Sequence, residues 1–212
     1  MAIYLDSARL EDARRAQELG FVVGITTNPA LVAQAGRPGL DIVRDLLALT
    51  GGYVFYQVIA DTVEERLEEA RQASRLDPAR VMIKIPATTE NLAMAAGLVA
   101  ADVLCAITAI SAASQAYLSA MVGATFTIPY VNRLTRQLGD GLAVVRDCQA
   151  AVAGSQTRVL AASLKSPAEV MSSITAGADD VTIPLDIILQ MGDHPLSDKA
   201  IEDFARHQAL RA

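Results

Sequence analysis

The chain has 212 residues, of which 52% are hydrophobic and 20% are charged, so its composition is that of one globular domain and not of a disordered segment. The net charge of −6 at pH 7 argues against a general nucleic-acid-binding protein, which would present a basic face, but it permits a phosphorylated substrate. Cys105 and Cys148 lie far apart without metal-ligand spacing. We therefore expect buried free thiols, no metal and no other cofactor.

Two features bear on cellular location. The N-terminal residues Met1–Asp6 lack the basic and long apolar regions of a signal peptide. Residues 103–132 contain no charge, which would permit a membrane span, but polar residues and a proline are spread along them. Two buried strands flanking a buried helix explain this stretch better. We expect a cytoplasmic protein with no membrane partner.

Short runs rich in Val and Ile recur along the whole chain, as strands favour. The expected strands are Ile3–Asp6, Val22–Thr26, Val54–Ile59, Val81–Ile85, Val103–Thr108, Thr125–Tyr130, Arg158–Ala162 and Asp180–Pro184.

Longer runs with helical periodicity separate these strands. The expected helices are Arg9–Leu19, Leu40–Leu49, Thr62–Ser74, Glu90–Ala100, Ser111–Met121, Gly141–Ala153, Pro167–Ala176 and Leu185–Met191, with a ninth, terminal helix at Asp198–Leu210.

Eight strand–helix units predict parallel strands joined by helical crossovers, and eight such units close naturally into a (β/α)₈ barrel. We expect residues 1–212 to form a single barrel domain, with an additional C-terminal helix over about 195–212. The runner-up is an open doubly wound sheet, which usually carries a glycine-rich first turn. The turn after the first strand, Asp6–Arg9, contains no glycine, so the barrel is preferred.

Polar residues close most of the expected strands. Alternate side chains of a strand face opposite ways, and the strand-end polar residues are out of phase with their apolar neighbours. In a barrel these ends meet at the C-terminal mouth, where barrel enzymes keep their active sites. The residues concerned are Asp6, Thr26, Asn28, Gln57, Lys84, Thr108, Tyr130 and Ser163.

Lys84 is the most informative of these residues. The chain contains only three lysines, and this one lies inside the apolar strand Val81–Pro86. Burial lowers the pKa of an ammonium group, and a neutral lysine is a nucleophile for carbonyl carbons. The alternative is a structural lysine that pairs with Asp6 across the barrel.

The other candidates also have structural alternatives. Asp6 suits proton transfer beside a nucleophilic lysine, or else it is an ion-pair partner. The turn Thr26–Pro29 could simply cap a helix. Tyr130 could belong to the core, and Arg133 could be a solvated surface charge. The turn Ser163–Pro167, which contains Lys165, could bind phosphate at a helix N-terminus or serve only as a cap.

Six motifs in register make the resemblance to a known family specific. They are Ile3–Asp6, Gly24–Pro29, Phe55–Val58, Ile83–Pro86, Pro129–Arg133 and Val159–Lys165. Together they strongly resemble the small transaldolase family, and in particular its fructose-6-phosphate aldolase branch, over nearly the whole chain.

The resemblance implies a barrel fold and a Schiff base at Lys84. It implies that Asp6 and Asn28 hold substrate hydroxyls and assist proton movement, and that Gln57, Thr108 and Tyr130 hold a catalytic water, with Tyr130 as the acid/base group. It implies that Arg133 and Ser163 bind the substrate phosphate. It also implies a ring-shaped homo-oligomer, often a decamer, in which the C-terminal helix packs on a neighbouring subunit.

Transaldolases of this family typically carry Glu where Gln57 stands and Phe where Tyr130 stands, so the resemblance favours the aldolase. We therefore expect a class I aldolase that interconverts fructose 6-phosphate, or a related ketose, with dihydroxyacetone and glyceraldehyde 3-phosphate. The alternatives are a transaldolase with the same intermediate and a non-catalytic sugar-phosphate-binding barrel. Members of the aldolase branch usually carry a small residue where Ile128 stands. Ile128 would narrow the substrate pocket if its side chain lines that pocket.

Overall fold

The chain folds into a closed barrel of eight parallel strands, each hydrogen-bonded to its sequence neighbours, with β8 pairing to β1. The computed structural model describes residues 1–209. The eight strands are β1 (Ile3–Asp6), β2 (Val22–Thr26), β3 (Val54–Gln57), β4 (Val81–Pro86), β5 (Cys105–Ile110), β6 (Phe126–Pro129), β7 (Arg158–Ala161) and β8 (Asp180–Ile183). The predicted barrel is therefore confirmed.

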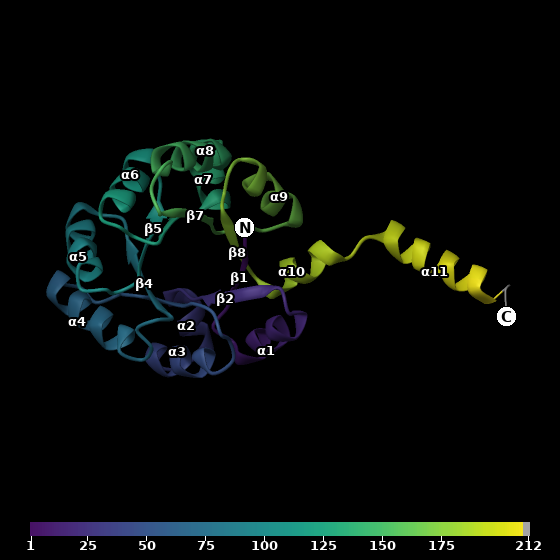
Figure 1. The fold of residues 1–212 in the computed structure, drawn as a ribbon, viewed down its shortest axis with the longest axis horizontal. Helices are drawn as coiled ribbons and strands as arrows, with labels where there is room; N and C mark the ends of the chain where they lie inside the picture. The colour runs from purple at the N-terminus through teal and green to yellow at the C-terminus, as the bar shows by residue number, and fades with distance from the viewer. Residues whose placement is uncertain (210–212) are drawn as a thin grey trace.

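Helices surround the strands as an outer ring (Figure 1). They are α1 (Leu10–Leu19), α2 (Pro29–Ala35), α3 (Gly39–Leu47), α4 (Val63–Ser74), α5 (Thr89–Val99), α6 (Ala113–Met121), α7 (Val131–Leu138), α8 (Gly141–Val152), α9 (Pro167–Thr175), α10 (Leu185–Gly192) and α11 (Pro195–Ala209). The sequence analysis did not predict α2 or α7. Both are short and begin within three residues of the end of a strand, where the apolar periodicity is too brief to stand out.

The two faces of each strand belong to different apolar layers. Outward residues such as Ile83 and Ile85 of β4 pack with the helices in the larger core. Inward residues such as Phe55, Met82 and Phe126 fill the barrel itself. Lys84 is in phase with Met82, so its side chain enters the barrel end that the apolar filling leaves open.

An aromatic cluster closes the interior beneath the site. The rings of Tyr4, Phe55 and Phe126 lie 5.6 to 5.9 Å apart, centroid to centroid. Gly24 makes this packing possible, because a Cβ atom there would come within 2.9 Å of the Tyr4 ring and 2.6 Å of the Tyr53 carbonyl oxygen. The barrel is therefore filled, and a ligand can enter only the C-terminal mouth.

Several predicted boundaries move by one to three residues. β3 ends at Gln57 instead of Ile59, and β5 spans Cys105–Ile110 instead of Val103–Thr108. A register irregularity between Thr108 and Ile110, with Ala109 at φ +58°, lets β5 continue past its expected end. The uncharged stretch resolves into β5, α6 and β6, and no helix within residues 1–209 has the length and apolarity to cross a bilayer.

The terminal helix α11 extends away from the barrel (Figure 1). It begins at Pro195, three residues before the predicted start at Asp198, and the predicted end at Leu210 lies outside the described residues. Three of its large apolar side chains are strongly exposed: Leu196 at 70%, Ile201 at 64% and Phe204 at 70%. Nothing in the described chain covers this apolar surface.

Candidate active site

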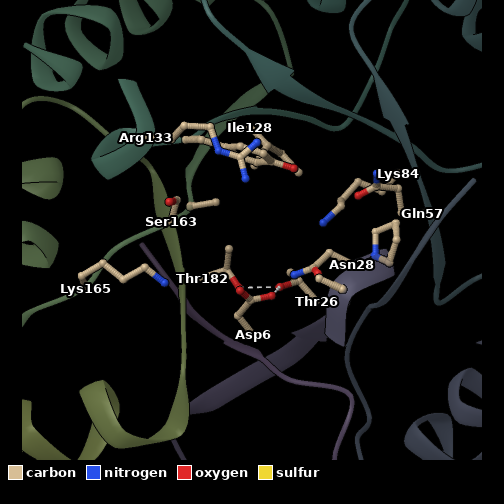
Figure 2. A pocket seen from close by; sticks show the side chains of 14 residues that line it. Asp6, Thr26, Asn28, Gln57, Lys84, Ile128, Arg133, Ser163, Lys165 and Thr182 are labelled. Carbon is tan, nitrogen blue, oxygen red and sulfur yellow. Dashed lines mark hydrogen bonds between the residues drawn. The ribbon is translucent and has the colours of Figure 1, made fainter. Parts of the chain in front are cut away.

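A cavity of about 370 Å³ opens at the C-terminal mouth of the barrel. The candidate side chains Lys84, Asp6 and Gln57 face it from different strands (Figure 2). The complete lining is Asp6, Thr26, Asn28, Pro29, Ala30, Gln57, Lys84, Ile128, Tyr130, Arg133, Ala162, Ser163, Lys165 and Thr182. Of the residues that the sequence analysis selected, only Thr108 is absent from this lining, and it lies directly behind Tyr130.

Lys84 lies in a desolvated position at the inner end of this cavity. Its residue is 5% exposed, and its Nζ atom donates a 2.7 Å hydrogen bond to the carbonyl oxygen of Thr27. Burial lowers the pKa of the amine to about 8, and the negative charge of Asp6 partly opposes that effect. No carboxylate of the described residues lies within 4.0 Å of Nζ, so the alternative of a direct Lys84–Asp6 ion pair is wrong.

Tyr130 meets the cavity with its hydroxyl group oriented by Thr108. Thr108 is fully buried, and its Oγ1 atom donates a 2.8 Å hydrogen bond to the Tyr130 hydroxyl oxygen. Because Tyr130 is the acceptor in this hydrogen bond, its own hydroxyl proton remains available for another acceptor in the cavity. Burial raises the pKa of Tyr130, so the phenol stays protonated at neutral pH.

Three polar side chains from β1, β2 and β8 form a directed chain of hydrogen bonds, drawn in Figure 2. Thr26 Oγ1 donates to Asp6 Oδ1 at 2.9 Å and lies 2.6 Å from Thr182 Oγ1. Because Thr26 uses its only hydroxyl proton on the carboxylate, Thr182 must donate to Thr26. The chain therefore ends on the carboxylate, which it holds in one orientation at the cavity wall.

Asn28 and Gln57 bring amide groups to the same mouth. Asn28 is the N-cap of α2, and its Oδ1 atom accepts from the backbone N–H of Leu31 at 3.1 Å. The capping alternative for this turn is thus correct, but Asn28 also lines the cavity and retains its amide N–H groups there. The Oε1 atom of Gln57 is buried without a hydrogen-bond partner in the described chain, so it offers a free acceptor to a water or a hydroxyl.

A positively charged side of the cavity faces Lys84. Figure 2 shows Ser163 and Lys165 across the cavity from Lys84, with Arg133 beside them. The Arg133 guanidinium carbon lies 4.8 Å from the Tyr130 ring centroid, so this arginine, although exposed to solvent, is held over the ring at the edge of the cavity. Three basic side chains line the cavity, Lys84, Arg133 and Lys165, and Asp6 is its single carboxylate. The mouth is therefore locally positive, although the chain as a whole is acidic. The cavity therefore suits an anionic, hydroxylated small molecule.

Residues 3–211 match the model of the family described as transaldolase/fructose-6-phosphate aldolase. The chain belongs to this family. It is therefore an enzyme, and the alternative of a non-catalytic binding barrel is set aside. Among the described residues, His, Cys, Asp and Glu form no group of three or more that could hold a metal ion.

Curated relatives of the family match along nearly their whole length. A probable transaldolase from Desulforudis audaxviator is 37% identical and aligns with 97% of this chain and 98% of its own. One from Symbiobacterium thermophilum is also 37% identical over 97% and 96% of the two chains, and probable transaldolase 1 of Listeria monocytogenes is 33% identical over 96% of each. The names of these relatives do not place the chain in the aldolase branch, which the sequence favoured.

Solved structures support the fold of this transaldolase/aldolase family member. An inosine 5′-monophosphate dehydrogenase from Legionella pneumophila superposes with a TM-score of 0.62 at 14% identity, over 88% of this chain and 58% of that one. A mandelate oxidase gives 0.59 at 19% identity, over 88% and 64%. At such low identity the likeness shows the barrel architecture alone.

Two polar residues of the lining, Thr182 and Lys165, were not among the candidates selected from the sequence. Thr182 lies in β8, whose remaining inward residue, Asp180, is fully buried at the far end of the strand. The alternation along β8 could have indicated Thr182, because it is in phase with Asp180. Lys165 was considered only as part of a turn, and its position on the cavity depends on how that turn packs against α7.

Proposed function

We propose that the chain is a Schiff-base transaldolase that transfers a dihydroxyacetone unit from a ketose phosphate to an aldose phosphate. The observation that carries this proposal is the buried amine of Lys84, with its pKa lowered to about 8, in a cavity with polar and cationic walls. The names of the relatives favour transfer, and the family as a whole acts on sugar phosphates.

The proposed chemistry begins at Lys84 Nζ. The free amine adds to the keto carbon of the substrate, an acid of the cavity supplies one proton, water leaves, and a protonated imine forms. Cleavage of the C3–C4 bond places its electron pair on the imine as an enamine, while the C4 hydroxyl gives its proton to a base of the cavity and an aldehyde leaves. Asp6 serves as this base, while the protonated Tyr130 remains a proton donor. The enamine then attacks the acceptor aldehyde, and hydrolysis frees the lysine.

Roles for the other lining residues follow from their positions. Asn28 would hold substrate hydroxyls with its amide. Asp6, which Thr26 orients, would hold them with its carboxylate. Gln57 and Thr108 would fix a water beside the Tyr130 hydroxyl group. Arg133 and Ser163, joined by Lys165, would bind the phosphate on the side of the cavity opposite Lys84. This places the phosphate away from the reacting carbon, which suits a sugar chain of several carbons.

A fructose-6-phosphate aldolase is the second candidate, and Tyr130 is the observation that favours it. An aldolase must protonate the enamine and release dihydroxyacetone, so it needs a proton donor in the cavity. The Tyr130 hydroxyl receives its hydrogen bond from Thr108 and keeps its own proton, as such a donor requires. Transaldolase and aldolase differ in whether turnover needs an acceptor aldehyde.

Borohydride trapping tests the shared chemistry. The protein is reduced in the presence of dihydroxyacetone or fructose 6-phosphate, and its peptides are analysed by mass spectrometry. We expect an adduct on Lys84 and none in Lys84→Ala, which should also lose cleavage activity while keeping its fold by circular dichroism. Lys165→Ala is the matched control, because that lysine also lines the cavity and should not be modified. An adduct elsewhere, or cleavage activity in Lys84→Ala, would overturn the assignment.

We also propose that α11 contacts a second copy of the chain in a homo-oligomer. Its exposed Leu196, Ile201 and Phe204 form an apolar surface that the rest of the described chain leaves uncovered. Exposed apolar side chains on a helix that projects from its own domain are stabilised by burial against another protein surface.

A further inference from the structure

Glu169 joins the two segments that carry the cationic side of the cavity. One segment is the first turn of α7 with its N-cap, which holds Tyr130 and Arg133, and the other is the loop from β7 into α9, which holds Ser163 and Lys165. Glu169 itself lies in the first turn of α9 and is absent from the cavity lining. Any effect that it has on a ligand must therefore pass through these two segments.

The two carboxylate oxygens of Glu169 bridge these segments with short hydrogen bonds. Oε1 accepts from Asn132 Nδ2 at 2.7 Å, and Oε2 accepts from the backbone N–H of Lys165 at 2.7 Å. The backbone N–H of Asn132 donates to the carbonyl oxygen of Ser163 at 3.2 Å, so the residues form a closed ring of contacts. Hydrogen bonds to an ionised carboxylate are roughly twice as strong as neutral ones.

The backbone held by this ring is strained. Ser163 has φ +60°, in the left-handed region that non-glycine residues rarely adopt. Such a conformation costs roughly 1–3 kcal/mol and persists only where its surroundings impose it. The Asn132 contact restrains the carbonyl of Ser163, and Glu169 restrains the N–H of Lys165 just beyond it. The ring therefore fixes both the strained turn and the direction in which Lys165 leaves it.

An ordinary helix cap does not explain the position of the Glu169 side chain. In α4 the side chain of Glu65, at the third position of the helix, accepts from the backbone N–H of the cap residue Thr62 at 3.1 Å, which completes a capping box. In α9 Ser166 occupies the same cap position and accepts from Glu169 N, but the Glu169 carboxylate turns to Asn132 and Lys165 instead. A carboxylate here also opposes an approaching anion, so its benefit is geometric and not electrostatic.

We propose that Glu169, through Asn132, is a positioning residue for the phosphate of the substrate, because it fixes the backbone from which Arg133 and Lys165 reach the cavity. This inference rests on the proposed function for its substrate class. Its consequence is selective: Glu169 should matter for phosphorylated ligands and not for Schiff-base formation at Lys84.

Acceptor selectivity gives the first test. With fructose 6-phosphate as the fixed donor, kcat/KM is measured for erythrose 4-phosphate and for erythrose. In Glu169→Ala and Asn132→Ala we expect the ratio of the two values to fall about ten- to a hundredfold, because small displacements of a binding group carry costs of that order. The double variant should lose no more than either single variant, since both break the same ring. Glu65→Ala is the matched control and should leave the ratio unchanged.

Glu169→Gln separates geometry from charge. A glutamine retains the size of the side chain but can accept at only one of the two positions, so the ratio should fall, and by less than in the alanine variant. A ratio that rises in Glu169→Gln would show that relief of repulsion dominates and would overturn the proposal. Equal losses of kcat/KM for erythrose and erythrose 4-phosphate would overturn the proposal as well, because they would show that Glu169 only supports the fold in general.

Binding of inorganic phosphate distinguishes this inference from the proposed function. Calorimetric titration of the protein with phosphate needs no Schiff base, and we expect roughly tenfold weaker affinity in Glu169→Ala than in the unmodified chain. If that loss appears while borohydride traps no adduct on Lys84, the proposed function fails and this inference stands. If an adduct forms and phosphate affinity is unchanged in the variant, this inference is wrong.

Discussion

The Nζ atom of Lys84 on β4 donates a 2.7 Å hydrogen bond to the backbone carbonyl oxygen of Thr27, at the end of β2. A carbonyl oxygen orients the amine without supplying the full negative charge that would keep it protonated. Burial accordingly outweighs the attraction of Asp6 and holds the pKa of the amine at about 8. The fold thus presents a nucleophile whose charge can be removed near neutral pH.

The first prediction concerns stability. The pKa of Lys84 is lower in the folded chain, about 8, than its ordinary value of 10.5, so the unfolded chain binds the proton more tightly. The resulting penalty is fully present below pH 8 and is lost as the pH rises from about 8 toward 10.5. Lys84→Met should therefore be more stable at pH 7 by up to roughly 3 kcal/mol. Urea unfolding at pH 7 and pH 9.5 measures this, and a difference that does not narrow at the higher pH would contradict it.

The second prediction concerns the pH dependence of imine formation. Below its pKa the free-amine fraction of Lys84 rises about tenfold per pH unit, so the initial rate of borohydride-trapped adduct formation with dihydroxyacetone should rise likewise and level off near pH 8. Asp6→Asn removes the charge that raises this pKa, so its inflection should lie at lower pH. The readout is adduct yield at short times across pH 6 to 10. An inflection near 10.5 in the unmodified protein would show that the amine is not desolvated.

The third prediction separates release from transfer. Tyr130→Phe removes the hydroxyl proton that Thr108 leaves free, so protonation of the enamine should slow by about a hundredfold, while capture by an acceptor aldehyde changes much less. Dihydroxyacetone release without acceptor and product formation with erythrose 4-phosphate are followed in parallel. Thr108→Val, which removes only the orienting bond, should have a smaller effect of the same sign. Equal losses in both reactions would contradict the proton-donor role.

The fourth prediction concerns Ile128, which lines the cavity at 1% exposure and packs against the apolar filling of the barrel. An isoleucine offers no hydrogen bond, so a substrate hydroxyl against it is desolvated without a partner. Ile128→Ser should raise kcat/KM for dihydroxyacetone relative to hydroxyacetone about fivefold, since one hydrogen bond is worth roughly 1 kcal/mol. Ile128→Val is the control that keeps an apolar wall. An unchanged ratio in the serine variant would place Ile128 away from the donor.

The fifth prediction concerns assembly. Removal of residues 194–212 takes away α11 with its exposed Leu196, Ile201 and Phe204, and it should reduce the oligomer to smaller species while the barrel keeps its circular-dichroism spectrum. Sedimentation velocity of the two proteins gives the comparison. Replacing the three apolar residues with serine in the full chain should have the same effect. An unchanged sedimentation coefficient in both variants would show that α11 is not in the interface.

The sequence by itself determined the architecture and most of the candidate site, for a local reason. Apolar runs of period two alternating with helical periods predict β/α units, and the phase within each run separates inward from outward residues. Lys84 could be selected because a charged residue inside Val81–Pro86 violates that pattern. Asp6 and Gln57 could be selected because they close their strands on the inward face. Boundaries were less certain, since the bulge at Ala109 depends on pairing with β6.

The tertiary structure alone decided how these residues meet. Register between strands brings Thr182 of β8 to Thr26 of β2, although the two are 156 positions apart in the chain. Packing of the turn before α9 against α7 brings Lys165 to the cavity and Glu169 to Asn132. Desolvation of Lys84 likewise arises only when eight strands close around it. Periodicity records which face of a strand is buried, whereas closure of the barrel determines which buried polar groups become neighbours.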